Sequence, residues 1–228
     1  MKKALLTAIA ATMLALPAAA PAKVIQLGSK IPPGPVSCPE DCQALSRVTG
    51  YQGRAGNIRD PFLIRRAGKI IAFTVRLGDP TEDQVRFFEE DLRLGEPRVM
   101  VSVLRRGKTR RTRNRHRLLA QSEAFRIKPY FGSAPTFVFE KPIRVTRRSI
   151  VALTTPTWAP ALTVGLGRDH WWRSSRRGGR CDNVSQRAQQ VELTSIKTFG
   201  CTYRTARLYY NVTYVPDNRA RRSERSRR

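Results

Sequence analysis

This 228-residue sequence has few of the residues from which most active sites are built. It contains two histidines, four cysteines and 17 acidic residues. His116 and His170 lie far in sequence from both cysteine pairs, which argues against a zinc site. Gly-x-Ser-x-Gly turns, His-Glu-x-x-His helices and phosphate-binding glycine loops are all absent. We therefore predict no catalytic residue, no metal site and no cofactor.

Long apolar runs are also absent after the first 22 residues. Lys2 and Lys3 precede an apolar run from Ala4 to Leu16, and Ala20-Pro21-Ala22 has the small-x-small pattern of a cleavage site. This pattern is typical of a signal peptide over residues 1–22. No later stretch reaches the roughly 18 apolar residues that a transmembrane helix needs. The sequence predicts a secreted protein, extracellular or associated with the cell envelope, that begins near Lys23.

Negative charge is scarce, and the formal net charge is +26. The basic residues are 34 arginines and 9 lysines. A field of this sign attracts polyanions, and the planar guanidinium suits phosphate or carboxylate. A GC-rich genome would enrich arginine without any functional demand, so both explanations of the excess stay open.

The four cysteines are Cys38, Cys42, Cys181 and Cys201. An even number in an exported chain favours disulfides over thiols. Of the three possible connectivities, closeness in sequence favours Cys38 with Cys42 and Cys181 with Cys201.

The chain divides by texture into three parts after the signal peptide. Residues 23–57 are proline-rich and carry the first cysteine pair, so we predict an N-terminal strap. Its segment Ser37-Cys38-Pro39-Glu40 has capping-box spacing and predicts a short helix that ends before Gly50. Residues 58–216 form the predicted β-sandwich domain, and residues 217–228 a disordered basic tail.

Period-two alternation marks most of the central part. Between Lys69 and Leu77 it places Ile71, Phe73, Val75 and Leu77 on one face. Further strands are predicted over 98–104, 118–122, 136–139, 150–154, 162–164 and 204–215. The last of these places Ala206, Leu208, Tyr210, Val212 and Tyr214 on one face. This spacing predicts an all-β fold, a two-sheet antiparallel β-sandwich of jelly-roll type with one or two short helices.

One amphipathic helix is predicted over residues 82–92. Thr81 and Gln84 have capping-box spacing, and Val85, Phe88 and Leu92 follow at helical intervals. Seven of the 17 carboxylates lie between Asp79 and Glu96. They indicate a solvated acidic face, and a calcium site is the less favoured interpretation because the carboxylates lack loop spacing.

Four segments together carry a resemblance to a known group of proteins. They are Gly68–Phe73, Pro129–Ser133, Val151–Ala161 and Cys201–Leu208. With them the chain resembles exported, arginine-rich actinobacterial proteins over roughly residues 37–216. The resemblance implies bacterial secretion and a jelly-roll-like β-sandwich, and it implies no active site.

The most basic stretch of the chain runs from Arg105 to Arg117 and predicts a hairpin with a long charged tip. The predicted polyanion-binding residues are Arg105, Arg106, Lys108, Arg110, Arg111, Arg113, Arg115 and Arg117. The tail from Arg219 is a second candidate. Extracellular DNA, lipid headgroups and anionic wall polymers fit as partners, whereas export argues against chromosomal nucleic acid. A solvated loop without a ligand is the competing interpretation.

The three tryptophans, Trp158, Trp171 and Trp172, fall in predicted loops of the C-terminal half. Indole faces beside Arg, Asp and His suit stacking on a sugar ring, so all three are candidate glycan-stacking residues. Core packing is the competing use, and it is the favoured one for Trp158 because strands usually bury their indoles. Neighbouring residues on a strand point apart, so Trp171 and Trp172 cannot both face inward.

Enzymatic interpretations are less favoured. Asp169 and His170 are neighbours, and we expect their side chains to point apart as they would on a strand. The glycine-rich segment Gly50–Gly56 lacks the lysine of a phosphate loop and predicts a turn. The leading hypothesis is a non-enzymatic exported β-sandwich that associates with anionic extracellular polymer, cell envelope or glycan. A secreted wall-polysaccharide hydrolase or lyase, and a structural envelope protein with no specific ligand, stay as alternatives.

Overall fold

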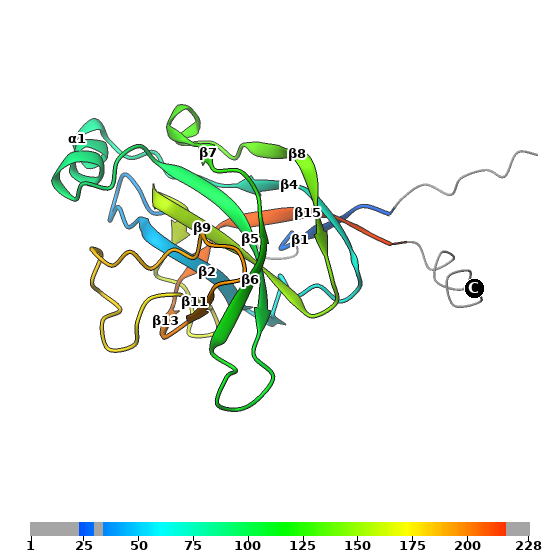
Figure 1. The fold of residues 1–228 in the computed structure, drawn as a ribbon. Coiled ribbons are helices and arrows are strands. Elements are labelled where there is room, and N and C mark those ends of the chain that lie inside the picture. Colours follow the sequence, from blue (N-terminus) through cyan, green and yellow to red (C-terminus); the bar gives the residue numbers. More distant parts are fainter. Residues whose placement is uncertain (1–22, 30–33, 218–228) are drawn as a thin grey trace, which may run out of the picture.

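The computed structural model describes residues 23–29 and 34–217 as an antiparallel β-structure (Figure 1). The predicted signal peptide and residues 218–228 of the predicted tail lie outside the described residues. No helix among the described residues has the length and apolar character needed to cross a membrane.

Two main sheets make up the fold, and every strand pair in them is antiparallel. The smaller sheet has the order β1 (Ile25–Leu27), β15 (Tyr210–Pro216), β4 (Gly68–Val75) and β8 (Thr136–Val145). The larger sheet has the order β12 (Ile196–Thr198), β6 (Arg115–Gln121), β5 (Arg98–Arg106), β9 (Ser149–Ala159), β2 (Leu45–Ala55), β11 (Trp171–Ser174) and β13 (Cys201–Arg204). Three short pairings complete the fold: β3 (Ile58–Arg59) on β2, β7 (Phe125–Arg126) on β5, and β10 (Leu162–Thr163) with β14 (Arg207–Leu208).

The main hydrophobic core lies between these sheets, and it follows from the predicted alternation. Val99, Val101 and Val103 of β5 are fully buried in it, opposite residues of β4 and β15. All five residues predicted to share a face between Ala206 and Tyr214 are buried there as well. The predicted all-β sandwich is therefore confirmed. The segment 204–215 is not one strand, however, because Thr205 adopts a positive φ of 56° and the chain changes sheet there.

Part of the outer face of the larger sheet is also buried. Residues 175–200 cross it, and Phe199 packs there in a second cluster with Tyr51, Leu104, Leu118, Ile150 and Ala152. A row of buried hydroxyls lies beneath the same segment, with 2.8 Å between the Oγ1 atoms of Thr49 and Thr154. The backbone nitrogen of Gln190 donates to Thr49 Oγ1 over 2.9 Å. We call residues 175–200 the covering segment.

The predicted face of β4 is wrong by one residue at its start. Ile70 is fully buried and Ile71 is partly exposed, the reverse of the prediction. The pairing with β15 passes from Ala72 directly to Ile70, so Ile71 is the extra residue of a β-bulge. A bulge shifts the alternation by one residue, which simple period-two reasoning does not anticipate.

The predicted helical segment over 82–92 is confirmed, although it changes type midway. It comprises the α-helix α1 (Glu82–Arg86) and a π-helical turn (Phe87–Asp91), and the Thr81–Gln84 capping box is formed. A short 3₁₀ turn follows at Lys128–Tyr130.

The helix predicted after Ser37 does not exist. Residues 38–42 form a tight turn, and β2 begins at Leu45 in the middle of the larger sheet, so the N-terminal strap ends well before residue 57. Both predicted disulfides are confirmed, Cys38 with Cys42 and Cys181 with Cys201. The Cys38–Cys42 bridge closes the turn itself, which is incompatible with a helix there. The second bridge joins the covering segment to β13.

Candidate functional site

The basic hairpin predicted from the sequence is formed by β5, β6 and the loop 107–114. It projects from the end of the larger sheet (Figure 1). Gly107 makes the tight closure possible, because a Cβ on it would lie 2.2 Å from the carbonyl oxygen of Thr112. Thr109 and Thr112 fix the tip by exchanging hydrogen bonds from backbone nitrogen to side-chain hydroxyl. This bonding leaves the cationic side chains of the loop free to face solvent.

A pocket of about 300 Å³ lies at the root of this hairpin. It is lined by Arg105, Arg106, Gly107, Thr112, Arg115, Arg117 and Ile196. Four of the eight predicted polyanion-binding residues therefore line one pocket, and no acidic residue is among its lining. We call this the root pocket.

The arginines of the root pocket come together through strand register. Arg105 of β5 pairs directly with Arg117 of β6, and Arg115 lies two residues before Arg117 on the same face. Directly opposed like charges are unfavourable in a sheet, unless something of opposite sign lies between them. Strand register therefore concentrates three cationic side chains on one small surface.

Neutral groups are the main partners of these guanidinium groups. Arg105 donates to the hydroxyls of Thr146 and Ser149, and Arg117 donates to the carbonyl oxygen of Thr194 over 3.0 Å. Arg106 lies 4.0 Å from the carboxylate of Asp60, at the limit of an ion pair. Among the described residues, Arg105, Arg115 and Arg117 form no ion pair, so their charge is not neutralised within the fold.

His116 lies between Arg115 and Arg117 in sequence but on the opposite face of β6, where it is fully buried. Its ring packs against Tyr51 and Phe199, with centroids 5.2 and 4.4 Å away. Burial, reinforced by the nearby charge of Arg106, lowers the pKa of His116 from 6.5 to about 4. His116 is therefore neutral at neutral pH and adds nothing to the charge of the root pocket.

The other predicted polyanion-binding residues are not gathered with the root pocket. Lys108, Arg110, Arg111 and Arg113 are exposed on the loop and do not line the pocket. The tail from Arg219 lies outside the described residues. The structure thus divides the predicted set into a built pocket and a solvated tip.

The glycan-stacking prediction is wrong for two of the three tryptophans. Trp158 is fully buried, is stacked on Phe88 and donates its indole hydrogen to the carbonyl of Gly95. Trp172 is buried in the main core and stacked on Tyr203. Both indoles complete hydrophobic clusters and leave no open face for a sugar. Trp171 is half-buried, so the expectation that the neighbouring pair diverges is confirmed.

Two further expectations about this region need correction. Asp169 and His170 do not point apart, since the Oδ1 and Nδ1 atoms of their side chains are 3.0 Å apart. They lie in a turn rather than on a strand, so the alternation rule does not apply. Gly50 and Gly53 belong to β2 rather than to a turn, and they make room for the indoles of Trp172 and Trp171.

Arginine burial is the functional feature that sequence reasoning missed. Arg176 is 7% exposed, and its guanidinium donates to the carbonyl of Cys181 and to the hydroxyl of Ser46, each over 2.8 Å. Arg207 is 3% exposed and lies over the ring of Tyr209. Burial lowers the pKa of Arg207 from its ordinary value to about 10. No charge count reveals such residues, because exposure depends on tertiary packing.

Comparison with known proteins adds no relative. No protein-family model, curated protein or solved structure matches this chain. Among the described residues, no group of three or more His, Cys, Asp or Glu side chains could hold a metal ion.

Proposed function

We propose that this protein is exported and binds an anionic extracellular polymer through the root pocket. The observation that carries the proposal is a pocket of about 300 Å³ lined by four arginines and no acid. Its volume matches the smaller ligand sites of proteins. Arginine offers two parallel donors to a phosphate, sulfate or carboxylate group, so repeated anionic groups along a chain suit this surface.

Charge and cysteine chemistry support the same proposal. The formal net charge of +26 gives the whole molecule a field that draws polyanions toward it. Two disulfides are typical of a protein that matures in an oxidising compartment. A signal peptide over residues 1–22, cleaved before Lys23, would deliver the chain there. Sequencing the amino terminus of the mature protein tests this step.

The pocket gives no comparable support to a polysaccharide hydrolase. Most glycoside hydrolysis uses two carboxylates on either side of the scissile bond. The residues that line the root pocket include none. We therefore propose binding, not turnover, as the function of this site.

The proposal is tested by the salt dependence of polyphosphate binding to the mature protein. With about four phosphate contacts, log affinity should fall by roughly 3.6 for each tenfold rise in salt. Tripling the salt concentration should then weaken binding roughly 50-fold. An affinity that does not depend on salt would refute the proposal.

Paired variants locate the site. Arg105→Gln with Arg117→Gln removes two charges from the root pocket and should reduce the salt slope by roughly 1.8. Arg110→Gln with Arg111→Gln removes the same charge from the exposed tip and should reduce affinity much less. Equal losses in the two variants would show that binding is diffuse and that the pocket is not the site.

A further inference from the structure

Trp171 is held in an unusual position on the larger sheet. Arg54 and Gln52 of β2 pair with Trp171 and Trp172, which leaves Gly53 between them as a bulge. A Cβ on Gly53 would lie 1.9–2.5 Å from three carbons of the Trp171 ring. The indole therefore rests directly against the backbone of β2, which only a glycine permits. Its orientation is fixed by the sheet rather than by a loop.

The indole of Trp171 lies outside the hydrophobic core, although one side of it rests on β2. It belongs to none of the hydrophobic clusters of the described residues, whereas Trp172 and Trp158 each belong to one. The Nε1 atom of Trp171 donates to no described atom. It is also not among the fully buried polar atoms that lack a partner, so solvent reaches it. The ring is rigidly placed and partly open, which suits it to serve as a stacking platform.

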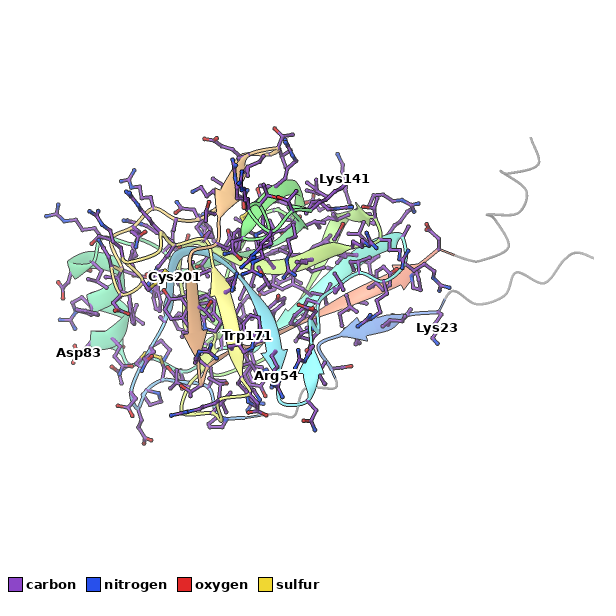
Figure 2. The ribbon with its side chains drawn as sticks, turned by 90° about the horizontal axis from the view of Figure 1, so that it is seen from below. Lys23, Arg54, Asp83, Lys141, Trp171 and Cys201 are labelled. Carbon is purple, nitrogen blue, oxygen red and sulfur yellow. A yellow bond between two sulfur atoms is a disulfide. The ribbon has the colours of Figure 1, made fainter. Side chains whose placement is uncertain are left out.

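Arginines flank this platform on both sides. Trp171 pairs directly with Arg54 on β2 and with Arg204 on β13, and paired residues in a sheet share a face. Figure 2 shows Trp171 and Arg54 side by side on neighbouring strands. Arg54 is oriented by donating its Nε hydrogen to the carbonyl of Gly56 over 2.8 Å. Within the described chain neither arginine forms an ion pair.

A carboxylate and an imidazole lie near Gly56, in the turn that follows Arg54. A Cβ on Gly56 would lie 3.7 Å from Asp169 Oδ2 and 3.9 Å from His170 Cε1. The same residue accepts the hydrogen bond from Arg54, so Gly56 is the point where Arg54, Asp169 and His170 meet. The site therefore combines an aromatic face, two guanidinium groups and a hydrogen-bond acceptor.

We infer that Trp171, Arg54, Arg204 and Asp169 form a second binding site, for an acidic sugar unit of a polysaccharide. The indole would cover the C–H face of the ring, the arginines would bind its carboxylate or sulfate, and Asp169 would accept from a hydroxyl. A nucleobase also stacks on indole. Asp169 favours the sugar, because its carboxylate can accept hydrogen bonds from ring hydroxyl groups, which a nucleobase lacks. This site uses β2, β11 and β13, whereas the root pocket uses β5, β6 and β12. It does not depend on the proposed function.

Intrinsic fluorescence tests the inference directly, because Trp158 and Trp172 are buried and acrylamide can reach mainly Trp171. Oligogalacturonate is the probe, with a neutral oligosaccharide of the same length as its control. Saturating oligogalacturonate should protect Trp171 from quenching in the wild-type protein. Trp171→Ala should weaken oligogalacturonate binding about tenfold in calorimetry. Trp171→Phe keeps an aromatic face and should weaken it less.

The arginine contribution has a matched control. Arg204→Gln should weaken oligogalacturonate binding roughly fivefold and leave the weaker binding of the neutral oligosaccharide unchanged. Arg147→Gln removes the same charge at an exposed turn between β8 and β9 and should change neither. Equal effects of the two variants would show that only net charge matters and would overturn the site.

Three other results would also overturn the inference. The first is no binding of uronic or sulfated oligosaccharides to the wild-type protein. The second is wild-type affinity in a Trp171→Ala variant whose circular dichroism is unchanged. The third is stronger protection of Trp171 by single-stranded DNA, which would assign the platform to nucleic acid. The root-pocket variant Arg105→Gln with Arg117→Gln should retain Trp171 protection, and its loss would show that the two sites are one.

Discussion

The two faces of the β5–β6 hairpin differ in environment, although both come from one basic stretch of the sequence. On one face Arg105, Arg115 and Arg117 line the root pocket and lack an ion pair within the described chain. On the other face His116 and Leu118 are fully buried beneath the covering segment. The period of a β-strand separates neighbouring residues into these two environments.

The comparison teaches that the number of basic residues is not the amount of available charge. Arg176 and Arg105 each add one positive charge to the net charge. Arg176, however, is buried and donates hydrogen bonds to a carbonyl and a hydroxyl. Its role is to hold the covering segment against β2, because Cys181 and Ser46 lie on those two elements. We call the side of the hairpin with Arg105, Arg115 and Arg117 the wet face, and the side beneath the covering segment the dry face. The wet face is expected to govern binding, and the dry face is expected to govern stability.

The largest expected effect comes from the dry face and acts through pH. The folded-state pKa of His116 is about 4, below its ordinary value of 6.5. Between pH 6.5 and 4, His116 therefore binds a proton in the unfolded chain but not in the folded chain. The free energy of unfolding that depends on His116 is highest above pH 6.5 and decreases as pH falls toward 4. The loss should amount to about 3 kcal/mol. Urea unfolding of wild type and His116→Phe across this range measures it, and parallel pH profiles would contradict it.

Removing the bridge that anchors the covering segment should cost a similar amount. The Cys181–Cys201 disulfide spans 20 residues, so replacing both cysteines by serine should lower the free energy of unfolding by about 3 kcal/mol. The Cys38–Cys42 bridge spans 4 residues, and its removal should cost only about 2 kcal/mol. Chemical denaturation without reductant compares the two, and a larger loss at the shorter bridge would contradict the expectation.

Arg176→Met should destabilise the fold by about 2 kcal/mol, because buried acceptors lose their donors. Arg177→Met is the control, since Arg177 is adjacent and exposed. Both variants lose one charge and should have the same affinity for polyphosphate. If Arg176→Met weakened binding without affecting stability, the division between a dry and a wet face would be wrong.

The smallest effect is expected on the wet face. Arg105 and Arg117 are opposed across two strands, so replacing both by glutamine should raise stability at low salt by about 0.5 kcal/mol. Thermal unfolding at low and high salt measures the difference, which should vanish as salt screens the repulsion. A loss of stability at low salt would show that the pair contributes to the fold through its contacts with Thr146, Ser149 and Thr194.

Local patterns predicted this protein wherever the chain obeys them. Alternation alone predicted the burial of Val99, Val101 and Val103, and residue spacing alone predicted the Thr81–Gln84 capping box. Prediction failed where one residue changes the phase, as Ile71 does in β4. It failed at Ser37–Glu40 because the disulfide between Cys38 and Cys42 closes a turn that the capping-box pattern cannot distinguish from a helix start.

Sequence alone determined the β class and the hairpin that carries the basic run, and it favoured the cysteine pairing that the structure shows, because each depends on neighbours along the chain. Only the tertiary structure decided which cations face solvent and which tryptophan stays open. Strand register placed Arg105 opposite Arg117, the covering segment buried His116, and a bulge at Gly53 positioned Trp171. These outcomes depend on contacts between residues far apart in sequence, and residue type does not specify them.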